Sequence, residues 1–167
     1  KKSLNPDPNN KIAQELRNYL SPYEEEMHRD WLTFERIMNK CKTTSLKFFI
    51  THGDPVGNVL KDNGKNIYLV DWDDIMLAPA ERDTWFLIDK PDFFRSYKKM
   101  FPEYKVNNLT YSFYLYNRYW EDLLGFIREV LSNKSQKHRE KNLKGFKKDC
   151  FGWLRPLIRR IELESIF

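Results

Sequence analysis

Two carboxylates and an amide lie within one short stretch of the chain. Asp54, Asn58 and Asp71 belong to the segment from Thr51 to Asp74, which reads T-H-G-D-P-V-G-N-V-L-K-D-N-G-K-N-I-Y-L-V-D-W-D-D. Carboxylate and amide oxygens bind hard cations such as Mg²⁺. If the amide and one carboxylate held a metal, the other carboxylate would be free to accept a proton.

A β-hairpin can gather these side chains. The dipeptide Asn63-Gly64 is a strong turn signal and stands between two apolar segments. A loop of even length centred on it places Asn58 opposite Leu69, with Asp71 two residues further on. Side chains two positions apart share a face of a strand, so Asn58 and Asp71 are predicted to be diagonal neighbours at the open end of the hairpin.

Helices are expected before the hairpin. One is predicted from about Asn10 to Leu20, and Ser21-Pro22 supplies the N-cap and the first-turn proline of the next. The apolar residues of this second helix recur every three or four positions, which predicts a core face: Met27, Trp31, Phe34 and Met38. A short strand is predicted from Leu46 to Thr51.

More helices are expected after the hairpin. Pro79 and Pro91 each open one, with Trp85, Phe86 and Ile88 buried in the first and Pro102 ending the second. A long amphipathic helix is predicted from Leu109 to Leu131, and a break at 132–135 precedes two C-terminal helices separated near Gly152 or Pro156. The apolar stripe of the long helix is Phe113, Tyr116, Trp120, Leu124, Ile127 and Leu131.

Acidic residues are concentrated in and after the central stretch. Residues 71–92 contain seven acidic and two basic side chains, a net charge of −5, which leaves +10 on the rest of the chain. This cluster fits a metal, a cationic substrate or both, and equally a set of solvated caps and loops. The acids are Asp71, Asp73, Asp74, Glu81, Asp83, Asp89 and Asp92.

Basic residues gather near the C-terminus instead. No recognised nucleic-acid-binding module surrounds them, so a solvated helix face is the preferred interpretation and nucleic-acid binding the weaker one. The residues are Lys134, Lys137, His138, Arg139, Lys141, Lys144, Lys147 and Lys148.

The bulk composition fits a compact protein. Of 167 residues, 41% are apolar and 16% aromatic, which is enough for a core. Residues 1–9 are expected to be a loose lead-in and 10–167 one domain. Cys41 and Cys150 have neither metal-site nor disulfide spacing, so both are expected to be small buried hydrophobes in a cytoplasmic protein. Because no apolar run reaches the ~20 residues of a membrane span, no membrane partner is expected.

Several common site types find no support. Neither G-x-S-x-G nor H-E-x-x-H occurs, and the three histidines are too few for the usual His-Asp metal cluster. Residues 71–74 begin like a calcium loop, but Met76 stands where that loop requires glycine. What remains is phosphoryl transfer, in which a base, an amide and a carboxylate on Mg²⁺ position the reactants.

Four motifs in a fixed order make this hypothesis specific. They are His52-Gly53-Asp54, Gly57-Asn58-Val59-Leu60, Leu69-Val70-Asp71-Trp72-Asp73-Asp74 and Ala78-Pro79-x-Glu81-Arg82-Asp83. Together they resemble the C-terminal lobe of the aminoglycoside phosphotransferase family, most of all its spectinomycin-type branch, over about residues 10 to 160. The resemblance implies an α+β, mostly α fold: the helical C-lobe of a protein-kinase-like phosphotransferase, with one β-hairpin carrying the site.

The resemblance also implies roles for the polar residues of the stretch. Asp54 would be the catalytic base, and Asn58 and Asp71 the Mg²⁺ ligands. Asp73 would contact metal or substrate, and Asp74 would contact the substrate. His52 would brace the loop, and Asp83 would tie a helix to it from a buried position.

ATP is the implied co-substrate, with Mg²⁺ as cofactor and the hydroxyl of a small molecule as acceptor. The acidic cluster favours a cationic acceptor such as an aminoglycoside or aminocyclitol, while choline-like and sugar acceptors stay open. Side chains of the long helix that lie off its stripe are expected at the acceptor: Tyr114, Arg118 and Tyr119.

Two features depart from the family pattern. Asp54 and Asn58 are four positions apart, where five is usual, and residues 1–45 contain no glycine. The glycine-rich loop of the N-terminal nucleotide lobe, and with it that lobe, is therefore expected to be absent from this chain. The alternative is a non-catalytic remnant or a partner-binding domain that keeps the fold. Apolar surface bared by the missing lobe would favour a homodimer.

Overall fold

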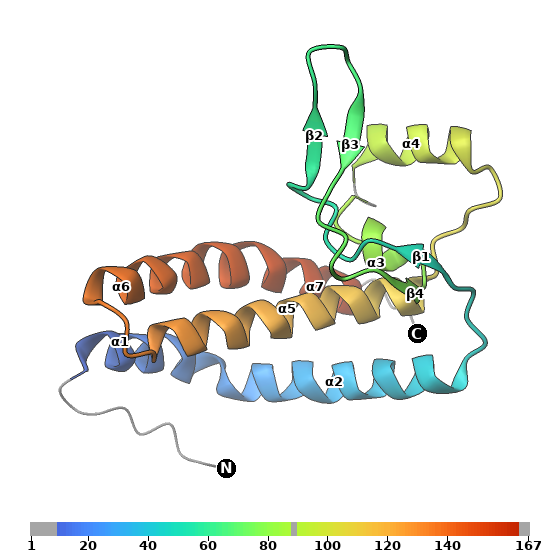
Figure 1. Cartoon of the computed structure of the whole chain (residues 1–167). Coiled ribbons are helices and arrows are strands. Elements are labelled where there is room, and N and C mark those ends of the chain that lie inside the picture. The colour runs from blue at the N-terminus through green and yellow to red at the C-terminus, as the bar shows by residue number, and fades with distance from the viewer. Residues whose placement is uncertain (1–9, 88–89, 164–167) are drawn as a thin grey trace. The chain divides into compact units, whose positions relative to one another are not determined.

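The computed structural model of the chain describes residues 10–87 and 90–163, the last four of these by backbone alone. It is mostly helical, as the sequence predicts, and has two small antiparallel sheets (Figure 1). The helical elements are α1 (Lys11–Leu20), the 3₁₀ turn η1 (Ser21–Tyr23), α2 (Glu24–Thr43), α3 (Glu81–Thr84), α4 (Pro91–Met100), α5 (Asn108–Val130), α6 (Gln136–Gly145), the π-helical η2 (Phe146–Leu154) and α7 (Arg155–Leu163). The strands are β1 (Phe49–Thr51), β2 (Val59–Lys61), β3 (Ile67–Leu69) and β4 (Met76–Ala78).

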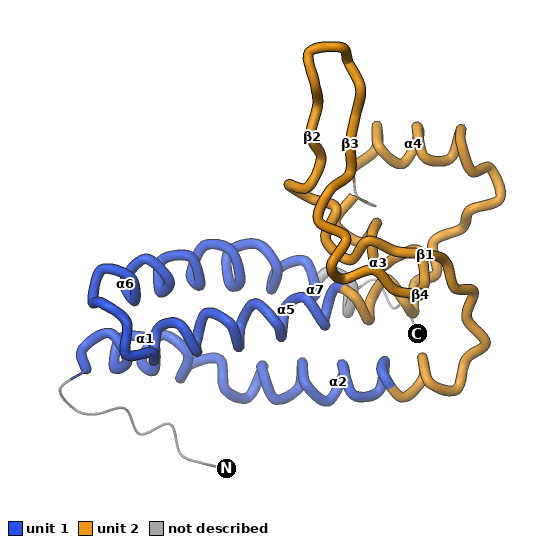
Figure 2. The backbone as a smooth tube through the Cα atoms, viewed as in Figure 1, with its two compact units in different colours: residues 1–38, 115–167 blue, residues 39–114 orange. Residues whose placement is uncertain are grey.

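Two compact units divide these elements (Figure 2). Unit 1 contains residues 1–38 and 115–167, and unit 2 contains residues 39–114. Helices α2 and α5 each contribute to both units. All candidate site residues from His52 to Asp83 lie in unit 2. Among the described residues, no helix is both long and apolar enough to cross a membrane.

Unit 1 is a set of helices packed through aromatic rings. Phe34 of α2 stacks on Tyr116 of α5 with ring centroids 6.1 Å apart. Tyr19 of α1 meets Phe146 of η2 edge to face at 5.9 Å. Such pairs add to the hydrophobic gain of burying the rings. The described side chains of unit 1 with 0% exposure include Leu115, Tyr116, Tyr119, Val130, Phe146, Cys150 and Ile158.

The start of α2 differs from the prediction. Ser21 has helical backbone angles, φ −52° and ψ −41°, whereas an N-cap residue needs non-helical ones. The chain therefore passes from α1 through η1 into α2 without the serine cap. In α2 the buried residues are Asp30, Phe34 and Ile37, while Trp31 of the predicted stripe is 39% exposed.

Helix α5 forms over nearly the predicted range, but its buried residues share only Tyr116 with the predicted stripe. Leu124, which the predicted stripe includes, is 54% exposed, and Tyr119, which it leaves out, is fully buried. Apolar side chains occur on several faces of α5, so their periodicity alone does not select the one that packs. The buried apolar residues of the helix are Tyr111, Leu115, Tyr116, Tyr119, Leu123 and Val130.

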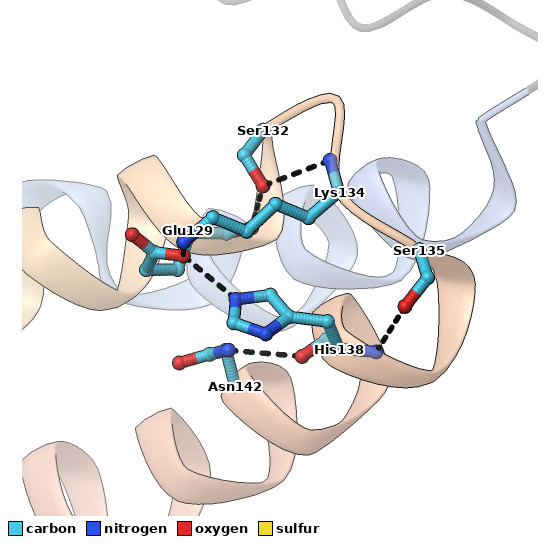
Figure 3. A network of polar contacts seen from close by, with 6 residues as sticks. All are labelled: Glu129, Ser132, Lys134, Ser135, His138 and Asn142. Carbon is cyan, nitrogen blue, oxygen red and sulfur yellow. Dashed lines mark hydrogen bonds and ion pairs between the residues drawn. The ribbon is translucent and has the colours of Figure 1, made fainter.

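A polar network fixes the turn between α5 and α6 (Figure 3). Oε2 of Glu129 accepts hydrogen bonds from Lys134 Nζ and His138 Nε2, each at 2.7 Å. Further along the basic segment, Lys147 Nζ lies 2.6 Å from Glu15 Oε1. These three members of the basic cluster thus have acidic partners within unit 1, which lowers the charge that the cluster presents to solvent.

The two predicted C-terminal helices are present as α6 and α7. The nine-residue π-helix η2 joins them, in place of the break expected at Gly152 or Pro156. Cys150 lies in η2, where burial raises the pKa of its thiol to about 12. Both cysteines are free thiols, as the sequence predicts, but Cys41 is only partly buried.

Unit 2 contains the two sheets, each of two strands. β1 pairs with β4, placing Ile50 opposite Leu77, and β2 pairs with β3. The sequence predicts β1 and the hairpin but misses β4. These strands expose much of their apolar surface, with Ile67 at 71%, Ile50 at 69% and Leu77 at 67%.

The hairpin register is one residue from the predicted one. Val59 pairs with Leu69, and Val70 N–H donates to Asn58 O at 2.9 Å. Asn58 therefore lies opposite Val70, not opposite Leu69. The diagonal pairing of Asn58 with Asp71 on one strand face is wrong, because a one-residue shift moves a side chain to the other face.

The turn explains this shift. Lys65 N–H donates to Asp62 O at 3.3 Å, and Lys65 itself has φ of 70°, whereas Gly64 is not left-handed. This is a three-residue loop, a turn followed by one left-handed residue, instead of a two-residue type I′ turn. Asp62 stabilises it by accepting from Asn66 N–H at 2.9 Å.

The helix predicted after Pro79 is short. α3 has four residues, and Trp85 and Phe86 follow it in partly buried positions. Ile88, predicted to be buried, lies outside the described residues. α4 begins at Pro91, as predicted, and ends at Met100.

Candidate functional site

The loop after β1 is bent tightly against α3. Gly53 has φ of +99°, a left-handed conformation that favours glycine. A Cβ at this position would lie 2.3 Å from Arg82 Nη2, so no larger residue fits without a shift. His52 is 2% exposed, while the Asp54 side chain that follows is exposed. The bend thus takes the chain from a buried histidine to a surface carboxylate within three residues.

His52 links this loop to the end of the hairpin. Its Nε2 lies 2.8 Å from Val70 O, and its Nδ1 accepts the N–H of Asp54 at 3.3 Å. A carbonyl only accepts, so these bonds assign the proton to Nε2 and the lone pair to Nδ1, the neutral tautomer. The ring of Trp72 lies 4.7 Å from the His52 ring. These are the contacts that a bracing role requires.

Asp83 holds the same loop from α3. Its Oδ2 accepts the N–H of His52 and its Oδ1 accepts the N–H of Gly53, both at 2.7 Å. Hydrogen bonds from amides to a carboxylate are short and strong. Both oxygens therefore engage backbone next to Asp54, which is the contact expected of a residue that ties the helix to the loop.

Asn58 closes the short step from Asp54. Its Nδ2 donates to Asp54 O at 2.8 Å. This bond uses the amide nitrogen, whereas a hard cation would bind through the amide oxygen. The segment from Asp54 to Asn58 therefore forms a closed turn, in which the Asn58 side chain is bonded to the backbone of Asp54, the predicted base.

Asp71 follows the hairpin in an unusual backbone conformation. It has φ of 66°, which aspartate tolerates better than most residues. Because of this conformation, the Asp71 side chain does not continue the alternation of side chains along β3. Asp71 directly follows Val70, which is hydrogen-bonded to Asn58 and His52. Asp71, Asp73 and Asp74 are all exposed, and Ile75 N–H closes a turn by donating to Trp72 O at 3.2 Å.

The acidic segment separates into two kinds of residue. Glu81 is 3% exposed and accepts three hydrogen bonds, from Tyr104 Oη at 2.9 Å, Asn107 N at 2.9 Å and Thr110 Oγ1 at 2.8 Å. With Asp83, it serves the internal structure of unit 2. The exposed acids are those of 71–74 and Asp92, and Asp92 lies 3.6 Å from Arg95. Asp89 lies outside the described residues.

The predicted acceptor residues occupy different environments. Tyr114 is in unit 2, and burial raises its pKa to about 12, against the opposing effect of the Arg82 charge. Arg118 and Tyr119 belong to unit 1. Nε of Arg118 lies 3.0 Å from Asp122 Oδ1, and Tyr119 is fully buried, which raises its pKa. The structure thus does not gather the three by any described contact, and their part in acceptor binding stays a prediction.

The donor set of the loop and hairpin end suits Mg²⁺. Asn58 supplies an amide oxygen with its nitrogen already fixed, and Asp71 supplies an exposed carboxylate. Oxygen ligands, with one or two carboxylates and further oxygens from substrate phosphates, are what Mg²⁺ takes. Among the described residues, no group of three His, Cys, Asp or Glu side chains is placed to hold a metal ion. The proposed pair is of another type, because one of its members is an amide.

Sequence reasoning assigns no role to three residues around the loop: Thr51, Glu81 and Arg82. Arg82 Nη1 donates to Thr51 Oγ1 at 2.9 Å, and Thr51 Oγ1 donates to Met76 O at 3.0 Å, which joins β1 to β4. In the sequence Glu81 stands in the acidic cluster and in the motif Ala78-Pro79-x-Glu81-Arg82-Asp83, with no role of its own assigned. Its position two residues before Asp83, in one helical turn, is the available signal that both acids have partners.

The comparisons with known proteins point to one enzyme. No protein-family model matches the chain, and no curated protein does either. Among solved structures, spectinomycin phosphotransferase APH(9)-Ia in complex with ADP and spectinomycin matches with 26% identity and a TM-score of 0.71, over 88% of this chain and 48% of that one. Its AMP-bound complex matches with 26% identity and a TM-score of 0.67, over 86% and 48%. The chain thus spans about half the length of these proteins, and it has the kinase-like fold of the aminoglycoside phosphotransferases.

Proposed function

We propose that this chain is the C-terminal part of an ATP- and Mg²⁺-dependent small-molecule O-phosphotransferase. One observation carries the proposal. Asp54, Asn58 and the residue before Asp71 are joined by hydrogen bonds, either to each other or to a single buried histidine, in a fold shared with a solved phosphotransferase. These bonds fix the backbone at Asp54 and just before Asp71, and a base, an amide and a carboxylate are the parts that phosphoryl transfer needs.

The residues would divide the work as follows. Asp54, exposed at the surface of unit 2, would accept the proton of the acceptor hydroxyl. Asn58 and Asp71 would hold Mg²⁺, with Asp73 and Asp74 nearby in sequence to contact metal or acceptor. When bound, the metal would offset the negative charge of the transferred phosphoryl group. His52 and Asp83 would keep the backbone on either side of Asp54 in place.

The acceptor is proposed to be a hydroxylated amine such as an aminocyclitol or aminoglycoside. Asp71, Asp73 and Asp74 are exposed acids beside the site, and a cationic molecule would be attracted to them. The solved neighbour holds spectinomycin and ADP.

The test uses the complete reading frame that encodes this chain. ADP release is measured with ATP, Mg²⁺ and a panel of aminocyclitols, aminoglycosides, choline and neutral sugars. We expect release with a cationic acceptor and a fall in kcat of about 10²–10⁴-fold in Asp54→Asn, the usual contribution of a general base. Asp71→Asn should raise the Mg²⁺ concentration needed for half-maximal ADP release, because the proposed site loses a charged ligand. His28→Gln, an exposed position in α2, is the matched control.

A folded product that binds neither ATP nor Mg²⁺ and releases no ADP with any acceptor would overturn this proposal. That result would favour the alternative, a non-catalytic domain that retains the fold.

A further inference from the structure

Helix α3 has four residues, and three of them are charged and face different parts of unit 2. Successive side chains on a helix are about 100° apart. Glu81 accepts from Asn107 and Thr110, where α5 begins. Asp83 accepts from the loop amides of His52 and Gly53. Arg82 lies between these two acids in the sequence, and its side chain approaches the same loop at Gly53.

The guanidinium of Arg82 lies directly against the backbone before Asp54. A Cβ built on Gly53 would be 2.3 Å from Nη2, 2.7 Å from Cζ and 2.8 Å from Nη1 of Arg82. Real Cβ atoms do not come that close, so a larger residue at 53 would have to displace the guanidinium. The positive φ of Gly53 favours glycine in any case, and a side chain there would also move Arg82.

Thr51 fixes the guanidinium in that place. Nη1 of Arg82 donates to Thr51 Oγ1 at 2.9 Å, and this hydroxyl donates onward to Met76 O at 3.0 Å. Thr51 is 2% exposed. The Arg82 side chain thus connects α3 to the β1–β4 sheet, and its guanidinium lies against Gly53.

We infer that Arg82 is a positioning residue for Asp54. The part of this inference that concerns catalysis rests on the proposed function. Arg82 makes no described contact with the Asp54 side chain. It limits the backbone of Gly53 on one side while Asp83 holds the amides of the loop, so the direction in which Asp54 leaves the loop is set by α3. A misplacement of about 1 Å at a reacting group can cost about a hundredfold in rate.

The first arm of the test is independent of any activity. Unfolding equilibria are measured by urea titration for the parent, Gly53→Ala, Arg82→Ala and the double variant. We expect Gly53→Ala to raise the unfolding constant about a hundredfold in the parent but about tenfold in the Arg82→Ala background, where the strain of positive φ remains. Equal effects in both backgrounds would overturn the inference. Amide hydrogen exchange at Gly53 and Asp54 should accelerate in Arg82→Ala and not in Arg95→Ala, an exposed arginine of α4.

The second arm measures catalysis in the complete reading frame. Arg82→Ala should lower kcat by about tenfold or more with KM for ATP within about twofold, and added ethylguanidinium should restore part of kcat in this variant but not in Asp54→Asn. Arg82→Lys, which keeps the charge but not the planar group, should remain impaired. An unchanged kcat in Arg82→Ala would overturn the inference. If the parent releases no ADP while the first arm shows coupling, the proposed function fails and the positioning of the loop by Arg82 stands.

Discussion

The two units of this chain differ in the contacts that stabilise each of them internally. Unit 1 buries large side chains completely, among them Tyr116, Tyr119 and Phe146. Unit 2 leaves most apolar residues of its strands exposed, and two of its carboxylates, Glu81 and Asp83, each accept from several donors. Hydrophobic burial has no direction, whereas hydrogen bonds do. The unit that carries the candidate site is therefore the one whose loops are fixed by directional contacts.

The largest expected effect tests the core of unit 1. Phe146→Ala removes a fully buried ring and should lower the free energy of unfolding by about 3–5 kcal/mol. Phe48→Ala, the same substitution at a ring that is 56% exposed beside β1, should cost less than about 1 kcal/mol. Urea titration of both variants measures the difference. Similar losses would mean that the two units do not differ in the use of apolar burial.

The next effect tests the polar contacts of unit 2. Glu81→Ala leaves the Asn107 amide without its acceptor and removes one of two partners from the Tyr104 and Thr110 hydroxyls. It should cost about 2–3 kcal/mol. The matched control is Glu140→Ala, at an exposed acid of α6. That variant should change the free energy of unfolding by less than about 0.5 kcal/mol. Chemical denaturation of the two variants compares them, and equal losses would contradict the structural role of Glu81.

A third effect compares buried tyrosines of the two units. Burial raises the pKa of Tyr119 in unit 1, and that of Tyr114 in unit 2 to about 12. In the unfolded chain tyrosine loses its proton near pH ~10. Above that pH the folded state holds more protons than the unfolded one, so stability should fall with rising pH, by up to about 1.4 kcal/mol per pH unit for each such tyrosine.

Tyr119→Phe and Tyr114→Phe should each flatten this alkaline decline, measured as the urea midpoint against pH. Tyr114→Phe should act up to about pH 12, because its folded-state pKa lies there. A decline that persists unchanged in the double variant would contradict the assignment.

The smallest effect concerns the hairpin turn. Lys65 has φ of 70°, which costs a residue with a Cβ about 1 kcal/mol or more and glycine almost nothing. Lys65→Gly should therefore stabilise unit 2 by about 0.5 kcal/mol after the entropy of the unfolded chain is counted. Lys61→Gly in β2, where no positive φ is needed, should destabilise it. Urea titration measures the change in the free energy of unfolding for both variants, and a destabilising Lys65→Gly would contradict the prediction.

Sequence reasoning succeeds where local chemistry decides. Pro91 begins α4, the hairpin forms around Asn63 and Gly64, and the order of motifs indicates the fold that the solved phosphotransferase shares. It fails where distant contacts decide. The face that α5 buries depends on which helices pack against it, and β4 exists because it pairs with β1, where Thr51 meets Met76.

For the same reason, the sequence predicts some features of the candidate site and not others. Its residue types follow from spacing, but the hairpin register depends on whether Lys65 or Gly64 takes the left-handed conformation. The contact between Arg82 and Gly53 joins residues far apart in sequence, and no local pattern indicates it. The roles of Asp54, Asn58 and Asp71 stay predictions until their variants are assayed.

The hairpin offers a place to attach a probe. Its open end is fixed where His52 bonds to Val70 O, and its tip, residues 63–65, lies beyond exposed strands. Exposed loop tips tolerate inserted residues well. A lanthanide-binding peptide inserted between Asn63 and Gly64 would therefore report on the loop that carries Asp54 by paramagnetic shifts.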